Sequence, residues 1–256
     1  MAYITVSGAD VYHEVAGDGP PLLLLHGGYC SIETMRAQID DLSRAYRVYA
    51  PERPGHGRTA DREGPITFDG IVTDIIGYMD AVGLADAHLL GFSDGGIAGL
   101  LLALDRAERV RSLVAIGANL DPSGLVEGDD AIDKSGADGH VPADPLVREL
   151  EQKMQADYDR LSPDGPEHAE VMREKLAQLW QNEPCIPVAR LASVTAPTLV
   201  MAGDHDSITT KHTVRIAEGI PHAQLCIVPG ASHLVMMERP ALVNRIVAEF
   251  LGAVAG

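Results

Sequence analysis

One serine stands in a glycine-rich setting that suits nucleophilic chemistry. The segment Gly91-Phe92-Ser93-Asp94-Gly95 has the pattern G-x-S-x-G, with an apolar run on each side of it. The pattern predicts a sharp turn from a strand into a helix, where close approach favours glycine two residues before and two after the serine. The N-terminus of the following helix would offer N–H groups and positive potential to negative charge that develops beside Ser93.

A serine hydroxyl is a weak nucleophile at neutral pH and needs a neighbouring base that a carboxylate orients. Two loops supply these groups. Gly203-Asp204-His205-Asp206 follows a predicted strand over 197–203, and His233 follows one over 223–228. The carboxyl ends of parallel strands meet at one edge of a sheet, so both loops are expected at the same edge as Ser93.

Asp94 is a second potential nucleophile because it directly follows the serine. Read in a shifted register, it would be the attacking carboxylate of a dehalogenase or an epoxide hydrolase. That register places Phe92 where a glycine is needed, so the serine interpretation is favoured. Two interpretations of the Asp94 side chain stay open. It either stabilises the helix N-terminus, by about 0.3–1 kcal/mol, or binds a cationic group of the substrate.

The elements that must position these residues alternate between short apolar runs and longer amphipathic ones. This order predicts βαβ units and a mostly parallel sheet with helices on its faces. Strands are predicted near 2–6, 10–16, 21–25, 46–50, 87–91, 110–116, 197–203 and 223–228, the first two as an antiparallel hairpin. Helices are predicted at about 32–44, 67–82, 95–106, 209–218 and 239–252.

Residues 121–193 depart from this alternation, because no strand signal occurs there and the composition shifts to proline and acidic residues. Two helical faces are predicted within the segment, one with Leu146, Leu150, Met154, Tyr158 and Leu161, the other with Met172, Leu176 and Leu179. The sequence therefore predicts a helical cap at 121–193, inserted into a core formed by residues 1–120 and 194–256.

The chain resembles the α/β-hydrolase fold family over nearly its whole length. The segments that carry the resemblance are His26-Gly27-Gly28, the stretch Arg53-Pro54-Gly55-His56-Gly57-Arg58-Thr59, the Ser93 turn, Gly203-Asp204-His205-Asp206 and His233. The chain order Ser, Asp, His is also that of the family. The GFSDGG turn is similar to that of valacyclovir-hydrolase-like members, which act on amino-acid esters. Glu52 and Thr59 depart from the aspartate and serine that the family often has.

The resemblance implies that Ser93 is the nucleophile, that His233 is the general base and then the general acid, and that Asp206 orients His233. Asp121, after the predicted strand 110–116, is the family's less common position for the carboxylate and is kept as a rival. Asp204 is expected to form a turn by accepting backbone N–H bonds.

The resemblance further implies an oxyanion hole formed by the backbone N–H groups of Gly28 and Asp94. Tyr29 and Cys30, which follow Gly28, are candidates for lining the substrate pocket. Among the other histidines, His26 is expected to orient the loop around Gly28. Surface positions are expected for His205, His212 and His222.

Composition excludes several other classes of protein. The formal net charge is −17, the wrong sign for gripping a phosphate backbone, so neither nucleic acid nor an anionic membrane is expected as a partner. No apolar run approaches the roughly 18 residues of a membrane span, and the first residues lack the pattern of a secretory leader. The three cysteines lack metal-site or redox-pair spacing. We therefore expect a cytoplasmic protein without metal or cofactor.

Together these features predict a cofactor-independent serine hydrolase that cleaves small neutral or cationic carboxylic esters, including lactones, through an acyl-enzyme. The same residues would also serve hydrolysis of thioesters, amides or carbon–carbon bonds, acyl transfer or perhydrolysis, since selectivity lies in the shape of the pocket. A non-turnover small-molecule receptor with the same fold is the alternative from another class.

Overall fold

The computed structural model describes residues 2–125 and 144–254. Eight strands form one sheet in the order β1-β2-β4-β3-β5-β6-β7-β8. β1 pairs antiparallel with β2, and β2 with β4, whereas the remaining pairs are parallel. The strands are β1 (Ala2–Val6), β2 (Ala9–Ala16), β3 (Pro21–Leu25), β4 (Arg47–Pro51), β5 (Ala87–Phe92), β6 (Val110–Ile116), β7 (Thr198–His205) and β8 (Gln224–Ser232). The predicted fold class, including the opening hairpin, is confirmed.

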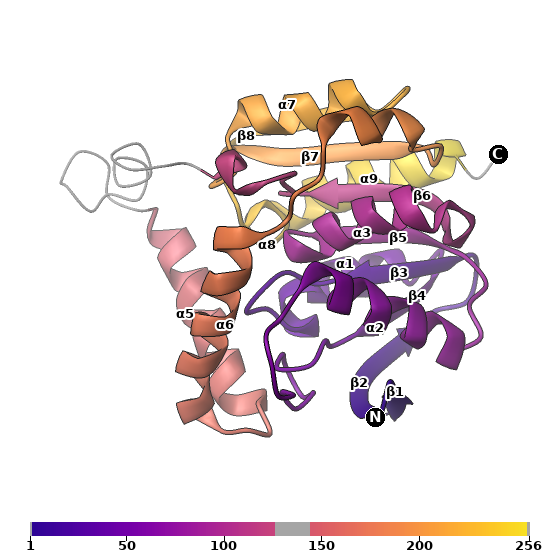
Figure 1. Cartoon of the computed structure of the whole chain (residues 1–256). Coiled ribbons are helices and arrows are strands. Elements are labelled where there is room, and N and C mark those ends of the chain that lie inside the picture. The colour runs from indigo at the N-terminus through magenta and orange to yellow at the C-terminus, as the bar shows by residue number, and fades with distance from the viewer. Residues whose placement is uncertain (1, 126–143, 255–256) are drawn as a thin grey trace.

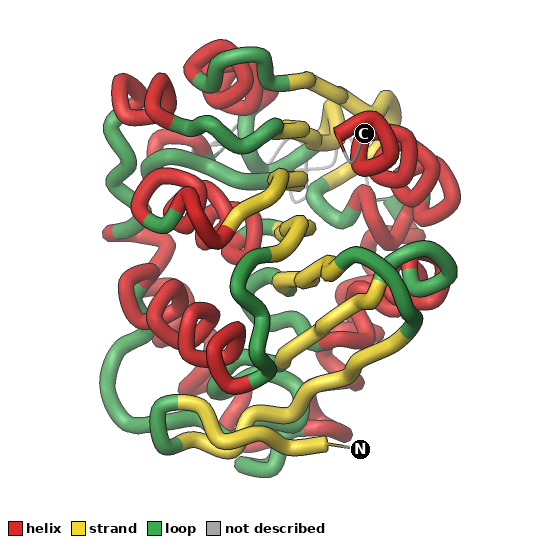
Figure 2. The backbone as a smooth tube through the Cα atoms, turned by 90° about the vertical axis from the view of Figure 1, so that its right-hand side faces the viewer, coloured by secondary structure: helices red, strands yellow, loops and turns green. Residues whose placement is uncertain are grey.

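Helices cover both faces of this twisted sheet (Figure 2). One face packs against α2 (Phe68–Ala81), α3 (Asp94–Asp105) and α7 (Thr210–Gly219). The other packs against α1 (Arg36–Leu42), α8 (Val235–Glu238) and α9 (Pro240–Val254). In β3, Leu23 and Leu25 belong to the first core and Leu22 and Leu24 to the second. Burial on both faces explains why the central strands lack polar alternation.

The predicted helices differ from the observed ones in detail. The segment 32–44 begins with a 3₁₀ turn at Ile32–Met35, where Ser31 caps the chain, and becomes α1 only at Arg36. Helix α8 was not predicted, because its four residues form about one turn and show no periodicity. This short helix matters for the site, since it directly follows the loop of His233.

Two long helices, α5 (Pro145–Leu161) and α6 (Ala169–Asn182), lie between β6 and β7 in the chain and side by side at one end of the sheet (Figure 1). On α6, Met172, Leu176 and Leu179 are buried as predicted. On α5, Tyr158 is buried, but Leu146 is exposed and Val147 packs against the core instead. Residues 126–143 of the predicted cap lie outside the described residues.

A helix that crosses a bilayer must be long and almost entirely apolar. Over residues 2–125 and 144–254, no helix combines the length and the apolar character needed to cross a membrane.

Candidate active site

Ser93 lies on the sharp turn between β5 and α3. Its φ of +52° is in the left-handed region that residues other than glycine rarely adopt. A Cβ on Gly91 would collide with the backbone of Gly95, and a Cβ on Gly95 would collide with the backbone carbonyl of Leu25. The turn is thus possible only with glycine at both positions, for the reason inferred from the sequence. It leaves Ser93 half-buried at the carboxyl end of β5.

His233 and Asp206 complete a chain of hydrogen bonds that begins at Ser93. His233 Nε2 lies 3.0 Å from Ser93 Oγ, and His233 Nδ1 lies 2.7 Å from Asp206 Oδ1. Asp206 is 2% exposed, and the N–H of Ile208 donates to the same Oδ1 at 2.8 Å. An ionised carboxylate only accepts, so His233 Nδ1 carries the proton and Nε2 is left to accept the proton of Ser93.

The pKa of His233 reflects two opposing effects. Burial disfavours the charged ring, but the Asp206 carboxylate, its hydrogen bond and the more distant charge of Asp94 outweigh burial and raise the pKa above the usual 6.5. The Asp206 carboxylate therefore stabilises the protonated form of the His233 ring.

Contacts that the sequence did not reveal fix the position of His233. Gly117, with a φ of +61°, lies directly after β6, and a Cβ there would approach the His233 ring to 2.9 Å. Glu238, in the unpredicted helix α8, accepts from the backbone N–H of Ser232 at 3.1 Å. Asp204 accepts a backbone N–H bond as predicted, but the donor is Gly230 at 2.7 Å, 26 residues away in the segment that leads to His233, and not a residue of its own turn.

The rival residues have other partners. Asp121 Oδ1 accepts from the backbone N–H of Ser123 at 3.0 Å, and its Oδ2 lies 4.0 Å from Arg215. His205 and His222 are exposed, as predicted. The prediction for His212 was wrong: it is 5% exposed, and its Nε2 accepts from the backbone N–H of Leu120 at 2.9 Å. The sequence pattern around a buried histidine that accepts a backbone N–H does not differ from that around a surface histidine.

The loop after β3 runs beside Ser93. A Cβ on Gly27 would lie 3.0 Å from Ser93 Cβ, and one on Gly28 would lie 2.7 Å from Asp94 Oδ2. Asp94 is the first residue of α3, where the backbone N–H has no partner inside the helix. The two residues predicted to form the oxyanion hole are therefore brought together next to the serine.

The Asp94 side chain lies in the first turn of α3, as the helix-stabilising interpretation expects, and both of its oxygens have partners. It is 1% exposed, its Oδ2 accepts from Arg53 Nη2 at 3.1 Å, and its Oδ1 accepts from Trp180 Nε1 at 2.9 Å. Arg53 is itself 8% exposed. The carboxylate is thus neither at a solvent-exposed helix end nor open to a substrate cation.

Tyr29 and Cys30, the predicted pocket residues, border a small cavity of about 10 Å³ together with Met154 and Tyr158 of α5. The Tyr29 ring stacks on Tyr158 at a centroid distance of 5.0 Å, and its hydroxyl donates to Gln155 at 2.8 Å. Cys30 is 5% exposed, and burial raises the pKa of its thiol to about 12. It is therefore a protonated, inert thiol at neutral pH.

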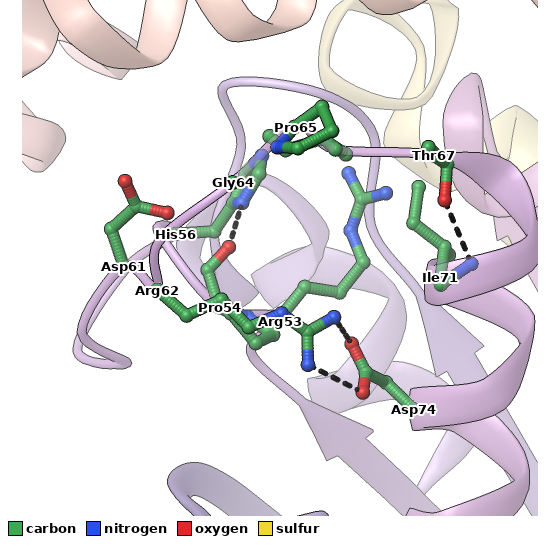
Figure 3. Close-up of a pocket in the computed structure, with 12 residues that line it drawn as sticks. Arg53, Pro54, His56, Asp61, Arg62, Gly64, Pro65, Thr67, Ile71 and Asp74 are labelled. Carbon is green, nitrogen blue, oxygen red and sulfur yellow. Dashed lines mark hydrogen bonds and ion pairs between the residues drawn. The ribbon is translucent and has the colours of Figure 1, made fainter.

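A second cavity, of about 40 Å³, lies between the loop after β4 and the start of α2 (Figure 3). Arg53 and His56 are among its lining residues, whereas Ser93 is not. Arg62 forms a paired contact with Asp74 there, at 2.9 and 2.5 Å. This cavity therefore borders Arg53 and is separate from the surroundings of Ser93.

A metal ion in a protein is held by several His, Cys, Asp or Glu side chains that lie close together. Within residues 2–125 and 144–254, no three His, Cys, Asp or Glu side chains are grouped so as to hold a metal ion.

Known proteins resemble this chain over almost its full length. A protein named "Putative carbamate hydrolase RutD" from Azorhizobium caulinodans is 29% identical, with 99% of each chain covered. The 2-hydroxymuconate semialdehyde hydrolase of Pseudomonas sp. CF600 is also 29% identical, covering 92% of this chain and 88% of its own. The structure of the enol-lactonase from Burkholderia xenovorans LB400 superposes with a TM-score of 0.79 at 21% identity, covering 98% of this chain and all of the other.

The names of the first two proteins describe hydrolases, and the similarity to the enol-lactonase structure extends to the whole fold. The sequence profile of the Alpha/beta hydrolase family matches residues 22–246, which include Ser93, Asp206 and His233. The chain belongs to the alpha/beta hydrolase family.

Proposed function

We propose that the protein is a serine hydrolase that cleaves small carboxylic esters or lactones through an acyl-enzyme. The observation that carries the proposal is the hydrogen-bond chain from Ser93 Oγ through His233 to Asp206, with distances of 3.0 and 2.7 Å. It has the geometry that a nucleophile, its base and an orienting carboxylate require. The raised pKa of His233 is consistent with a ring that becomes positively charged during the reaction.

In the proposed reaction, His233 takes the proton of Ser93 as the serine oxygen attacks the carbonyl carbon. The backbone N–H groups of Gly28 and Asp94 hold the oxyanion, and the alcohol leaves with the proton from His233. Water then gives a proton to His233 and attacks the acyl carbon. As the bond from that carbon to Ser93 Oγ breaks, His233 returns the proton to Ser93 Oγ and the acid is released.

We further propose that residues 121–193 are a cap on a core of residues 1–120 and 194–256. Two contacts support this assignment: Tyr29 of the core stacks on Tyr158 of α5, and Trp180 of α6 donates to Asp94 beside the serine. The α5–α6 pair would therefore form part of the substrate pocket, with Tyr29 and Cys30 at its base.

Esters and lactones are the first choice because an enol-lactonase shares the fold and because their cleavage needs only the residues described. The names of other relatives point to carbamates and to a semialdehyde as further substrates, and carbon–carbon cleavage is open to the same residues. All of these share the attack of an oxygen nucleophile at a carbonyl carbon, so one panel of substrates distinguishes them.

The test is hydrolysis of p-nitrophenyl acetate and butyrate, followed by a panel of lactones, aminoacyl esters, aryl carbamates and β-diketones. Ser93→Ala should lower kcat by a factor on the order of 10⁴–10⁶ while the circular dichroism spectrum stays unchanged. A Ser93→Ala protein that keeps more than about a tenth of the wild-type activity would refute the assignment of the nucleophile. A wild-type protein that binds such compounds but turns none of them over would favour the receptor alternative.

A further inference from the structure

We infer that Arg53, Asp94 and Trp180 form a positioning network through which helix α6 controls the geometry of the oxyanion hole. The inference rests on the proposed function. It assigns a positioning role to side chains that do not touch the reacting atoms. It is carried by three contacts: Trp180 to Asp94, Arg53 to Asp94, and Arg53 to the peptide group that precedes Gly28.

The first part of the network holds the N–H of Gly28. Arg53 Nη2 donates to the carbonyl oxygen of Gly27 at 2.9 Å, and His26 Nδ1 lies 2.8 Å from the same oxygen. That carbonyl and the N–H of Gly28 belong to one planar trans peptide group and point in opposite directions. Fixing the carbonyl oxygen of Gly27 therefore fixes the direction in which the N–H of Gly28 points.

His26 is held in the form that this arrangement needs. The backbone N–H of Arg53 donates to His26 Nε2 at 3.0 Å, so the ring proton sits on Nδ1 and is donated to Gly27. Burial and the neighbouring Arg53 charge lower the pKa of His26 to about 3, and the ring stays neutral. The backbone N–H of Arg53 thus fixes the tautomer of His26, which is a neutral donor through Nδ1. The side chain of Arg53 binds the same carbonyl oxygen as His26, that of Gly27.

The second part of the network holds Asp94, whose own N–H is the other proposed oxyanion donor. The same nitrogen of Arg53 that binds Gly27 also donates to Asp94 Oδ2 at 3.1 Å. One guanidinium nitrogen thereby joins the loop after β3 to the first turn of α3. The two oxyanion donors come from separate segments of the chain, and Arg53 is the side chain that links them.

Trp180 connects this pair to the α5–α6 pair. Its Nε1 donates to the other oxygen of Asp94, Oδ1, at 2.9 Å. The indole also lies against the oxyanion loop, since a Cβ on Gly28 would be only 2.5 Å from Trp180 Cζ2. Both oxygens of Asp94 are thus occupied, one from the core and one from α6. A displacement of α6 acts directly on the residue that follows the nucleophile.

The first test is Trp180→Phe, which keeps an aromatic side chain at this position and removes the indole N–H together with part of the fused ring system. Kinetics of p-nitrophenyl butyrate hydrolysis should show kcat lowered about five- to tenfold, the size of one lost hydrogen bond, with KM unchanged within about twofold. The second-order rate of labelling by a fluorophosphonate should fall by the same factor, because that reaction also needs the oxyanion hole.

The matched control is Lys175→Met on the same helix. Lys175 Nζ contacts Asp61 Oδ2 of the core at 2.5 Å, so the variant removes a contact between α6 and the core that lies outside the network. Its kcat should stay within about twofold of the wild-type value. Thermal unfolding of both variants measures their stability. If Trp180 had only a structural role, Trp180→Phe would lower the Tm but leave kcat unchanged at a temperature where the protein is folded.

Asp94→Asn is the second variant: it loses the charge, and its single amide oxygen can accept from only one of Trp180 and Arg53, because its NH2 group faces the other donor. We expect kcat to fall by about tenfold or more, up to the 10²–10³ that loss of an oxyanion donor causes elsewhere. An unchanged kcat in Trp180→Phe, or an equal loss in Lys175→Met, would overturn the network while leaving the nucleophile in place. A wild-type protein that neither hydrolyses esters nor reacts with the fluorophosphonate would instead overturn the proposed function, and the network with it.

Discussion

Asp206 is proposed to orient His233, and Asp121 was the alternative position for that carboxylate in the sequence. Asp206→Asn should lower kcat by about 10⁴, because an amide beside Nδ1 favours the tautomer of His233 that cannot accept the proton of Ser93. Asp121→Asn should stay near wild type, since Asp121 binds Ser123 and lies near Arg215. Steady-state kinetics of the two variants decide the point. A crippled Asp121→Asn beside a normal Asp206→Asn would place the carboxylate on the other strand.

In the proposed reaction, the protonation state of His233 sets how activity depends on pH. The base works as the neutral ring, and its pKa lies above 6.5, so the neutral form appears only as the pH rises through that higher value. The pH profile of kcat/KM should therefore show a single acid limb with a midpoint above 6.5, and activity lost as the pH falls through it. A limb with a midpoint well below 6.5, or no limb between pH 5 and 9, would be incompatible with His233 as the base.

Residues that touch the serine could be predicted from the sequence because each of them follows a predicted strand. Ser93, Asp206 and His233 meet at one edge of the sheet for that reason. The partners of Asp94 could not be predicted from the sequence. Trp180 is 86 positions away, and the apolar periodicity of its helix does not indicate where the indole N–H donates. Arg53 lies in a glycine-rich motif that gives no sign of a buried ion pair with Asp94.

At the scale of elements, apolar runs were sufficient to predict all eight strands, because most of them are buried on both faces. Periodicity predicted α6 well but misplaced part of the buried face of α5, where Val147 rather than Leu146 packs against the core. Helix α8 is too short to show a period. Its importance follows from the contact between Glu238 and Ser232 beside His233, which depends on tertiary structure alone.

The turn between β5 and α3 gives an element-scale prediction. Gly91→Ala places a Cβ against the backbone of Gly95 and Gly96, so it should destabilise the fold by about 1–3 kcal/mol or more and distort the serine turn. Thermal unfolding should show a lower Tm, by about 2–4 °C for each kcal/mol.

Gly252→Ala is the matched control for this variant. Gly252 lies within α9, and a Cβ there would have no atom within 4 Å. Alanine at this position should leave activity unchanged and raise the stability by up to about 1 kcal/mol. A Gly91→Ala protein with the wild-type Tm and kcat would contradict the close approach described for the turn.

At the scale of the whole molecule, the net charge of −17 is concentrated in part over residues 121–193, where acids exceed bases by nine. Along α5 and α6, Glu149, Glu151, Glu170 and Glu174 are exposed, and Asp94 is paired with Arg53. The acidic field is therefore mostly a surface field, which salt screens within about 10 Å at 0.1 M.

This distribution predicts a weak preference among charged substrates. At low ionic strength an alanyl ester should be cleaved up to several-fold faster, in kcat/KM, than its uncharged propionyl counterpart, and a hemisuccinyl ester more slowly. The preference should vanish at moderate salt. Persistence in salt together with loss in Asp94→Asn would show that Asp94 meets the substrate after all. Preference for the hemisuccinyl ester at both salt concentrations would indicate a cation in the pocket, with Arg53 the first candidate.

Covalent labelling tests directly whether Ser93 is the nucleophile. The protein is treated with a fluorophosphonate, digested and analysed by mass spectrometry, with His233→Ala as a parallel sample. We predict one adduct per chain, on the Ser93 hydroxyl, formed far more slowly in His233→Ala. Rapid modification of a different residue, or labelling of Ser93 at the same rate without His233, would contradict the account.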